Sequence, residues 1–138
     1  MGIGLAALPP DAVVAMWGAL RPMLERGFDA GASMMPDDFL DEVKAGKVLV
    51  WCAAEQETAN IVSVATTRLV PMRGGLVCWI CQCSGEHMAN WLHFIGRLEA
   101  YAKAEGCVRT IIQGRRGWER VLGDEGYRVR TVQLEKSI

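Results

Sequence analysis

The sequence lacks the features that mark several classes of protein. No apolar run approaches the roughly 20 residues that a membrane-spanning helix needs. The formal net charge is only −1, so no strong field draws the chain toward nucleic acid or an anionic membrane. The first residues, MGIGLAALPPDAV, contain no basic segment and do not resemble a signal peptide. These absences favour a cytoplasmic protein without a nucleic-acid or membrane partner.

Length and composition indicate one folded domain over residues 1–138. Hydrophobic residues make up 51% of the chain and charged residues 22%, which is typical of a globular protein with a sizeable core. The five cysteines are an odd number without a secretory context, so we expect reduced thiols.

Hydrophobic periodicity predicts a mixed α/β protein. Helical spacing predicts helices over about 11–26, about 36–46, 88–105 and 117–126. Strand-like runs lie at 48–54, 61–70, 76–83, 107–114 and 127–136. Short turn-rich connections join the first three strands and predict an antiparallel meander. The segment 76–113 is a strand–helix–strand unit, whose right-handed crossover makes its two strands parallel neighbours. We therefore expect a mixed sheet with helices on both faces.

The stretch LVCWICQCSGEH, residues 76–87, concentrates three cysteines and a histidine and raises the question of a metal or redox site. Cys78 and Cys81 have the C-x-x-C spacing of zinc ligands, but zinc ligand pairs sit on tight turns and need a second pair elsewhere. On a strand, residues three apart point to opposite faces. The remaining cysteines outside this stretch are isolated, and His87 and His93 fall on different faces of the following helix. We expect no metal and no disulfide, with the cysteines serving as small buried hydrophobes.

The end of this stretch, CQCSGEH, supports a second interpretation. A strand followed by a small-residue turn and a helix N-terminus aims several backbone N–H groups at one point, which favours an anion such as phosphate. Ser84 and Gly85 supply that turn. The alternative is purely structural: Ser84 caps the helix and Gly85 permits the turn.

At these residues the chain resembles the GNAT superfamily of N-acetyltransferases. That family places a phosphate loop of pattern Q/R-x-x-G-x-G/A between its fourth strand and third helix. The segment 82–87 matches the glutamine and the first glycine, whereas His87 stands at the last small position. Gly126-Tyr127 resembles the family's glycine–aromatic pair before its last strand. GRRGW, residues 114–118, is similar to a motif of small GNAT-like proteins of phages and prophages.

The resemblance implies acetyl transfer from acetyl-CoA to a small amine or a protein amine. The pantetheine arm would follow the strand edge near Ile80, and the diphosphate would lie on the amides at the helix start. The cofactor-binding residues implied are Ile80, Cys81, Gln82, Ser84, Gly85, Glu86, His87 and Met88. Glu55, at the end of a strand, and His87, in the loop, are the candidate catalytic bases; the alternative for each is a solvated surface residue.

Two departures from the family keep a second function open. Many members have a tyrosine four residues before the glycine–aromatic pair, where it protonates the thiolate leaving group, and Leu122 stands there. The glutamine of the loop also lies on the strand itself, so fewer amides reach a phosphate. The alternative is a catalytically inactive GNAT-fold binding or virion-associated protein. Tyr127 is expected to pack in the core, and the partners considered include a second copy of the chain in a homodimer.

Overall fold

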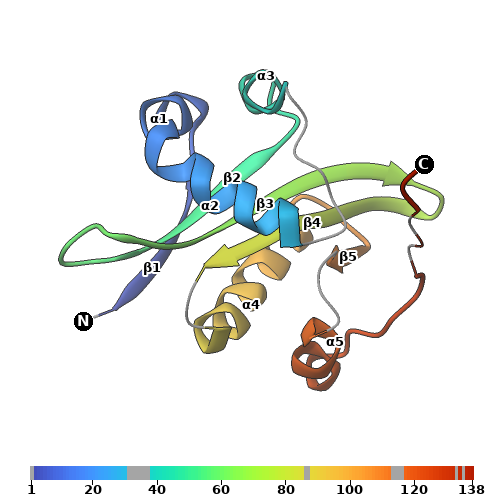
Figure 1. Ribbon diagram of the computed structural model, residues 1–138. Coiled ribbons are helices and arrows are strands. Elements are labelled where there is room, and N and C mark those ends of the chain that lie inside the picture. The colour runs from blue at the N-terminus through green and yellow to red at the C-terminus, as the bar shows by residue number, and fades with distance from the viewer. Residues whose placement is uncertain (1, 31–37, 86–87, 113–116, 133, 135) are drawn as a thin grey trace.

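The computed structural model describes residues 2–30, 38–85, 88–112, 117–132, 134 and 136–138 (Figure 1). Five strands, five α-helices and a 3-10 turn follow one another in these residues. Their order is β1 (Ile3–Leu8), α1 (Pro10–Ala15), α2 (Trp17–Ala30), α3 (Phe39–Lys44), β2 (Leu49–Glu55), β3 (Ile61–Met72), β4 (Gly75–Gly85), α4 (Met88–Ala104), β5 (Arg109–Ile112), α5 (Gly117–Leu122) and η1 (Gly123–Glu125).

The strands form one mixed sheet in the order β1-β2-β3-β4-β5. The pairs β1–β2, β2–β3 and β3–β4 are antiparallel, whereas β4 and β5 are parallel. The predicted meander and the predicted parallel pair around the crossover helix are both confirmed. The fold class expected from the sequence, α/β with an antiparallel meander and a parallel strand–helix–strand unit, is therefore correct.

Helices cover both faces of the sheet, as Figure 1 shows with α1, α2 and α3 on one side and α4 and α5 on the other. Each side has its own hydrophobic core. The core under the N-terminal helices contains Val13, Leu20, Leu24, Phe39, Val43, Val48, Val50 and Val64. The core under α4 contains Trp51, Ala65, Cys78, Ile80, Phe94, Ile95, Leu98 and Leu122, among others. Each large aliphatic side chain buried here contributes roughly 1.5–3 kcal/mol to the free energy of folding.

The N-terminal region differs from its prediction in two ways. The strand β1 was not expected, because IGLAAL has little strand signal and is held by its full register against β2, from Ile3 opposite Glu55 to Leu8 opposite Val50. The single helix expected over 11–26 is wrong, because the chain breaks at Met16, where φ is −99° and ψ is 10°. Buried Val13 and Leu20 keep helical spacing across the break, so the apolar pattern conceals it.

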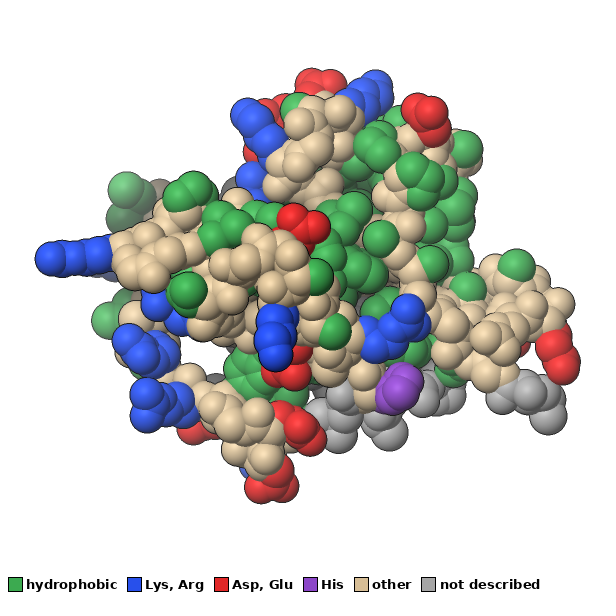
Figure 2. Space-filling view, turned by 180° about the vertical axis from the view of Figure 1, so that it is seen from behind, with side chains coloured by type: hydrophobic (Ala, Val, Ile, Leu, Met, Phe, Trp, Pro, Cys, Tyr) green, Lys and Arg blue, Asp and Glu red, His purple; other side chains and the backbone are tan. Residues whose placement is uncertain are grey.

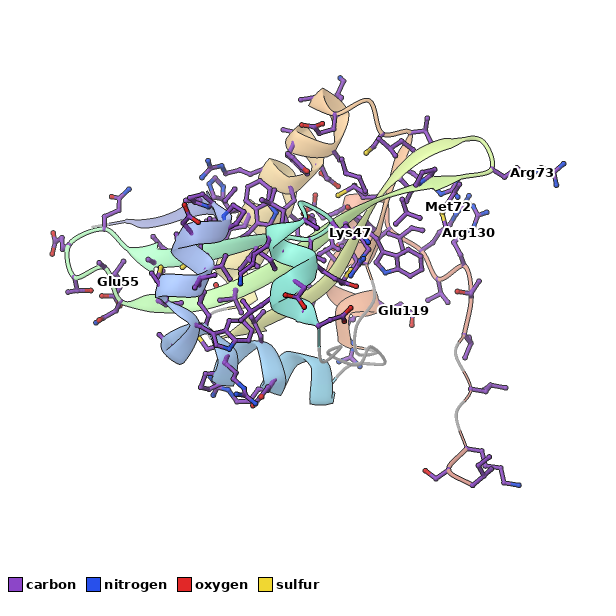
Figure 3. All side chains as sticks on the ribbon, turned by 90° about the horizontal axis from the view of Figure 1, so that it is seen from above. Lys47, Glu55, Met72, Arg73, Glu119 and Arg130 are labelled. Atoms are coloured by element: carbon purple, nitrogen blue, oxygen red, sulfur yellow. The ribbon has the colours of Figure 1, made fainter. Side chains whose placement is uncertain are left out.

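The strand expected over 127–136 is also wrong. The described residues of this segment form no strand, and Val129, Val132 and Leu134 are 54%, 75% and 90% exposed. Figures 1 and 3 show the segment running clear of the sheet. Alternating apolar residues permit a strand, but a strand also needs a backbone partner, and this segment has none among the described residues.

Candidate functional site

In the described residues, the parallel strands β4 and β5 pair only along the first half of β4. Their pairing runs from Val77 opposite Arg109 to Ile80 opposite Ile112, where β5 ends. The strand β4 continues to Gly85. Among the described residues, no strand pairs with this edge of β4 from Cys81 onward. Backbone N–H and C=O groups on such an edge bind an extended ligand as an added strand would.

A β-bulge lies at the same point. Thr66 of β3 pairs with Gln82, but Thr67 pairs with Ile80, so Cys81 is an extra residue in β4. A bulge bends its strand and changes the direction of the groups on it. Here it falls directly after Ile80, the last residue of β4 that pairs with β5 in the described chain.

The helix α4 begins close to the end of this free edge. β4 ends at Gly85 and α4 begins at Met88, and its 17 residues provide a substantial helix dipole with its positive end at this junction. The backbones of Gln82, Ser84 and Gly85 lie on the free part of β4 as expected. Glu86 and His87 lie outside the described residues.

Charged and polar side chains surround Cys81 on the face of the sheet that carries α3. Arg68 of β3 forms an ion pair with Glu42 of α3, and the side chains are 34% and 20% exposed. Burial alone would lower the pKa of Arg68, but the hydrogen bond and charge of Glu42, with a smaller effect of Cys81, raise it. We call Glu42, Thr66, Arg68 and Cys81 the bulge cluster.

The thiol of Cys81 is neutral in this cluster. Burial raises the pKa of Cys81 and outweighs the charge of Arg68, which lowers it. A neutral thiol is a poor nucleophile. Thr66 Oγ1 is buried without a hydrogen-bond partner among the described residues.

The other face of the bulge is closed by α4. Cys78 and Ile80 are fully buried there, which confirms that Cys78 and Cys81 point to opposite faces. Burial raises the pKa of the Cys78 thiol to about 12, with smaller contributions from Cys107 and Cys81. No group of three or more His, Cys, Asp or Glu side chains in the described chain could hold a metal ion.

Tyr127 also belongs to the α4 side. Its hydroxyl lies 2.6 Å from Thr110 Oγ1 and donates to Glu99 Oε2 at 2.8 Å. Burial raises the pKa of Tyr127, and Glu99 raises it further despite Thr110. The ring packs against the core under α4, which confirms the expected packing role. Leu122, where many GNAT proteins have their acid, is 2% exposed in the same core.

Glu55 lies apart from the bulge. Its carboxylate accepts a hydrogen bond from Thr58 Oγ1 at 2.9 Å in the β2–β3 turn, at the far end of the sheet in Figure 3. Leu49 of β2 is opposite Thr67 at the bulge. At about 3.3 Å per residue along β2, Glu55 is therefore roughly 20 Å from that position.

Basic side chains gather at the opposite end of the molecule. Figure 2 shows them on the flank that carries the β3–β4 turn and the C-terminal segment, and Figure 3 places Arg73 and Arg130 there beside Met72. Arg109 contacts Met72 Sδ at 3.8 Å. A hollow of about 420 Å³ near this end is lined by Lys47, Arg68 and Tyr101, among others. The basic flank lies at the start of β4, far from the junction with α4.

Solved structures of acetyltransferases share this fold. An acetyltransferase of Trypanosoma brucei superposes with a TM-score of 0.71 at 17% identity, covering 99% of this chain and all of the other. A predicted acetyltransferase of Clostridium acetobutylicum, solved with acetyl-CoA, has a TM-score of 0.71 at 14% identity, covering 99% and 96%. The chain has the fold of the GNAT acetyltransferases.

A third GNAT-fold structure is an aminoglycoside acetyltransferase from an uncultured soil metagenomic sample, in complex with sisomicin. Its TM-score is 0.69 at 12% identity, covering 99% of this chain and 96% of that one. No protein-family model and no curated protein matches the sequence. The likeness therefore lies in the fold and not in the residues.

Sequence reasoning missed the bulge cluster. Glu42 and Arg68 are 26 positions apart, and no spacing rule connects them. One signal was present: Arg68 interrupts the otherwise uncharged run IVSVATTRLV, and a charged residue in a half-buried strand usually has a partner.

Among the described residues, no helix is long and apolar enough to cross a membrane.

Proposed function

We propose that this protein is an N-acetyltransferase that takes the acetyl group from acetyl-CoA and transfers it to an amine. The observation that carries the proposal is the coincidence of the β4 bulge, the free β4 edge and the start of α4. The fold shared with acetyltransferases, one of them solved with acetyl-CoA, supports it.

The residues of the junction fit the donor. The backbone of Cys81 and Gln82 would pair with the amide groups of a pantetheine arm along the free edge, directly after Ile80, whose partner in β5 is Ile112. The amides from Ser84 through Glu86 and His87 to Met88 would hold the diphosphate at the positive end of α4. The thioester supplies an activated acetyl group. The chain itself contributes orientation and backbone donors toward an oxygen on which negative charge develops.

Binding of the donor is tested by thermal unfolding with CoA and acetyl-CoA. A ligand at about 100 times its dissociation constant stabilises a protein by roughly 2.7 kcal/mol. Gly85→Glu should abolish this response because a bulky anionic side chain would occupy the phosphate position. Gly123→Glu is the matched control, since Gly123 is exposed and a Cβ there meets nothing within 4 Å. Equal CoA responses of both variants and the wild type would contradict the site.

Transfer is tested by release of free thiol from acetyl-CoA in the presence of sisomicin or spermidine, two amines of different shape. The buried Leu122 in place of a tyrosine favours one competing function, a GNAT-fold protein that binds but does not catalyse. Under that alternative, CoA would still shift the melting temperature, but no amine would release thiol. Glu55 and His87 remain candidate bases and would be tested by alanine substitution in the same assay.

A further inference from the structure

We propose that Glu42 binds the ammonium group of the acceptor and takes its proton, with Arg68 as the residue that positions the Glu42 carboxylate. This inference rests on the proposed acetyl transfer and assigns its acceptor side. It makes the acceptor a cationic amine that approaches β4 from the face carrying α3.

The two faces of the sheet differ in access to the bulge. On the α4 side, Cys78 and Ile80 are 0% exposed beneath Phe94, Ile95 and Leu98 of the same core. On the α3 side, the Arg68 and Glu42 side chains keep 34% and 20% of their surface exposed. An acceptor that reaches the free edge of β4 at Cys81 must therefore come from the α3 side.

The charges on this side are arranged around the bulge. Arg68 bonds Glu42 and also acts on the Cys81 thiol, and the charge of Glu42 is felt at Cys81 as well. Glu42 thus lies within electrostatic reach of the extra residue of β4. A carboxylate in this position attracts an ammonium group, and Arg68 holds the carboxylate in place by its ion pair.

Thr66 gives independent evidence that the bulge cluster lacks one hydrogen-bonding partner. Its side chain shares the α3 face with Arg68, is 1% exposed, and has no hydrogen-bond partner among the described residues. A buried hydroxyl without a partner is costly, and such groups in native proteins usually have an unobserved ligand or a functional role. A polar group of the bound acceptor would supply the missing partner.

The ammonium loses one proton to Glu42, and the resulting amine nitrogen forms a bond with the thioester carbonyl carbon. The carbon–sulfur bond breaks, and the sulfur leaves with the electron pair. The sulfur takes the second proton from the nitrogen, and Glu42 returns its proton to solvent. General-base catalysis of this kind typically contributes about 10²–10⁴-fold to a rate.

The test compares Glu42→Gln with Glu25→Gln, which makes the same change in the exposed Arg21–Glu25 ion pair of α2. CoA binding is measured by calorimetry, and transfer is measured with sisomicin, spermidine and hydroxylamine, which is uncharged at neutral pH. We expect Glu42→Gln to bind CoA normally and to lose about 100-fold or more in kcat/KM for the two cationic amines. Transfer to hydroxylamine, which does not need the carboxylate, should persist, and Glu25→Gln should match the wild type.

A charge-swapped variant, Glu42→Arg with Arg68→Glu, separates function from structure. It restores an ion pair between α3 and β3 with reversed positions, so a merely structural role would restore transfer along with stability. Any of three results would overturn the inference. The swapped variant recovers transfer, Glu42→Gln loses transfer to cationic and neutral nucleophiles equally, or the wild type binds CoA but transfers to neither cationic amine. If the wild type does not bind CoA, that result refutes the proposed function, and the inference with it.

Discussion

Thr66 and Thr67 are adjacent, both 1% exposed, and should respond in opposite ways to the same substitution. The Thr67 hydroxyl accepts a hydrogen bond from Trp51 Nε1 at 2.9 Å in the core under α4. The Thr66 hydroxyl has no partner among the described residues. Valine has nearly the shape of threonine and replaces only the hydroxyl by a methyl group.

Thr67→Val should destabilise the protein. It leaves the buried indole N–H of Trp51 unpaired, because Trp51 is only 8% exposed and water cannot readily replace the lost acceptor. The cost of an unsatisfied buried donor is about 1–3 kcal/mol. Thr66→Val should instead stabilise the free protein by about 1 kcal/mol or more, since it removes a buried hydroxyl that gains nothing in return.

Urea titration of both variants and the wild type measures the two effects in the free energy of unfolding. For a chain of this size, each kcal/mol corresponds to about 3–5 °C in melting temperature. The same Thr66→Val variant should transfer acetyl groups less well, because the hydroxyl no longer meets the acceptor. Destabilisation of similar size in both variants would refute the reasoning, since it would mean that Thr66 Oγ1 is satisfied.

Three further predictions concern the junction, a buried thiol and the β3–β4 turn. Gly85→Glu should remove the melting response to CoA with little change in the unliganded melting temperature, and a retained response would place the donor elsewhere. Because burial raises the folded-state pKa of Cys78 to about 12 from its ordinary value of 9.0, its contribution to stability is complete below pH 9.0 and declines toward pH 12. The loss is about 1.4 kcal/mol per pH unit for each such group, so Cys78→Ala should flatten the alkaline fall in unfolding free energy, and an unchanged slope would count against the burial. Gly75→Ala should lower the melting temperature more than Gly74→Ala. The φ angle is positive at both positions, but only at Gly75 would the new Cβ lie 2.8 Å from Val108 Cγ1. Equal shifts in melting temperature would argue against that close contact.

The sheet was predictable from the sequence where pattern and neighbours agreed. The runs at 48–54, 61–70 and 76–83 are apolar or alternating and are joined by short turns, so each strand and its nearest partner could be predicted together. β1 could not, because its pairing with β2 spans three intervening helices. The alternation over 127–136 was misleading because periodicity reports which side chains share a face and says nothing about whether an edge is present to pair with.

For the candidate site, the sequence allowed a prediction of the backbone elements and not of the side-chain contacts. The strand–turn–helix order placed Gly85 and Met88 at a junction, and the phase of Cys78 and Cys81 separated the two faces. The bulge at Cys81 is a single extra residue with no composition of its own. The Glu42–Arg68 pair depends on how α3 packs over β3, which is a tertiary contact that local patterns do not encode.

The position of β1 at one edge of the sheet bears on how the chain folds. β2, β3 and β4 are joined by short turns and can pair as local hairpins, whereas β1 reaches β2 only after three helices have been brought into place. Closing a long loop costs entropy that short hairpins avoid, and non-local pairing slows folding. β1 should therefore be among the last strands to dock, fixed there by Arg97, which donates to the Leu5 carbonyl at 3.1 Å. Until then the outer edge of β2 is open to strands of other chains, so the refolding yield should fall as protein concentration rises.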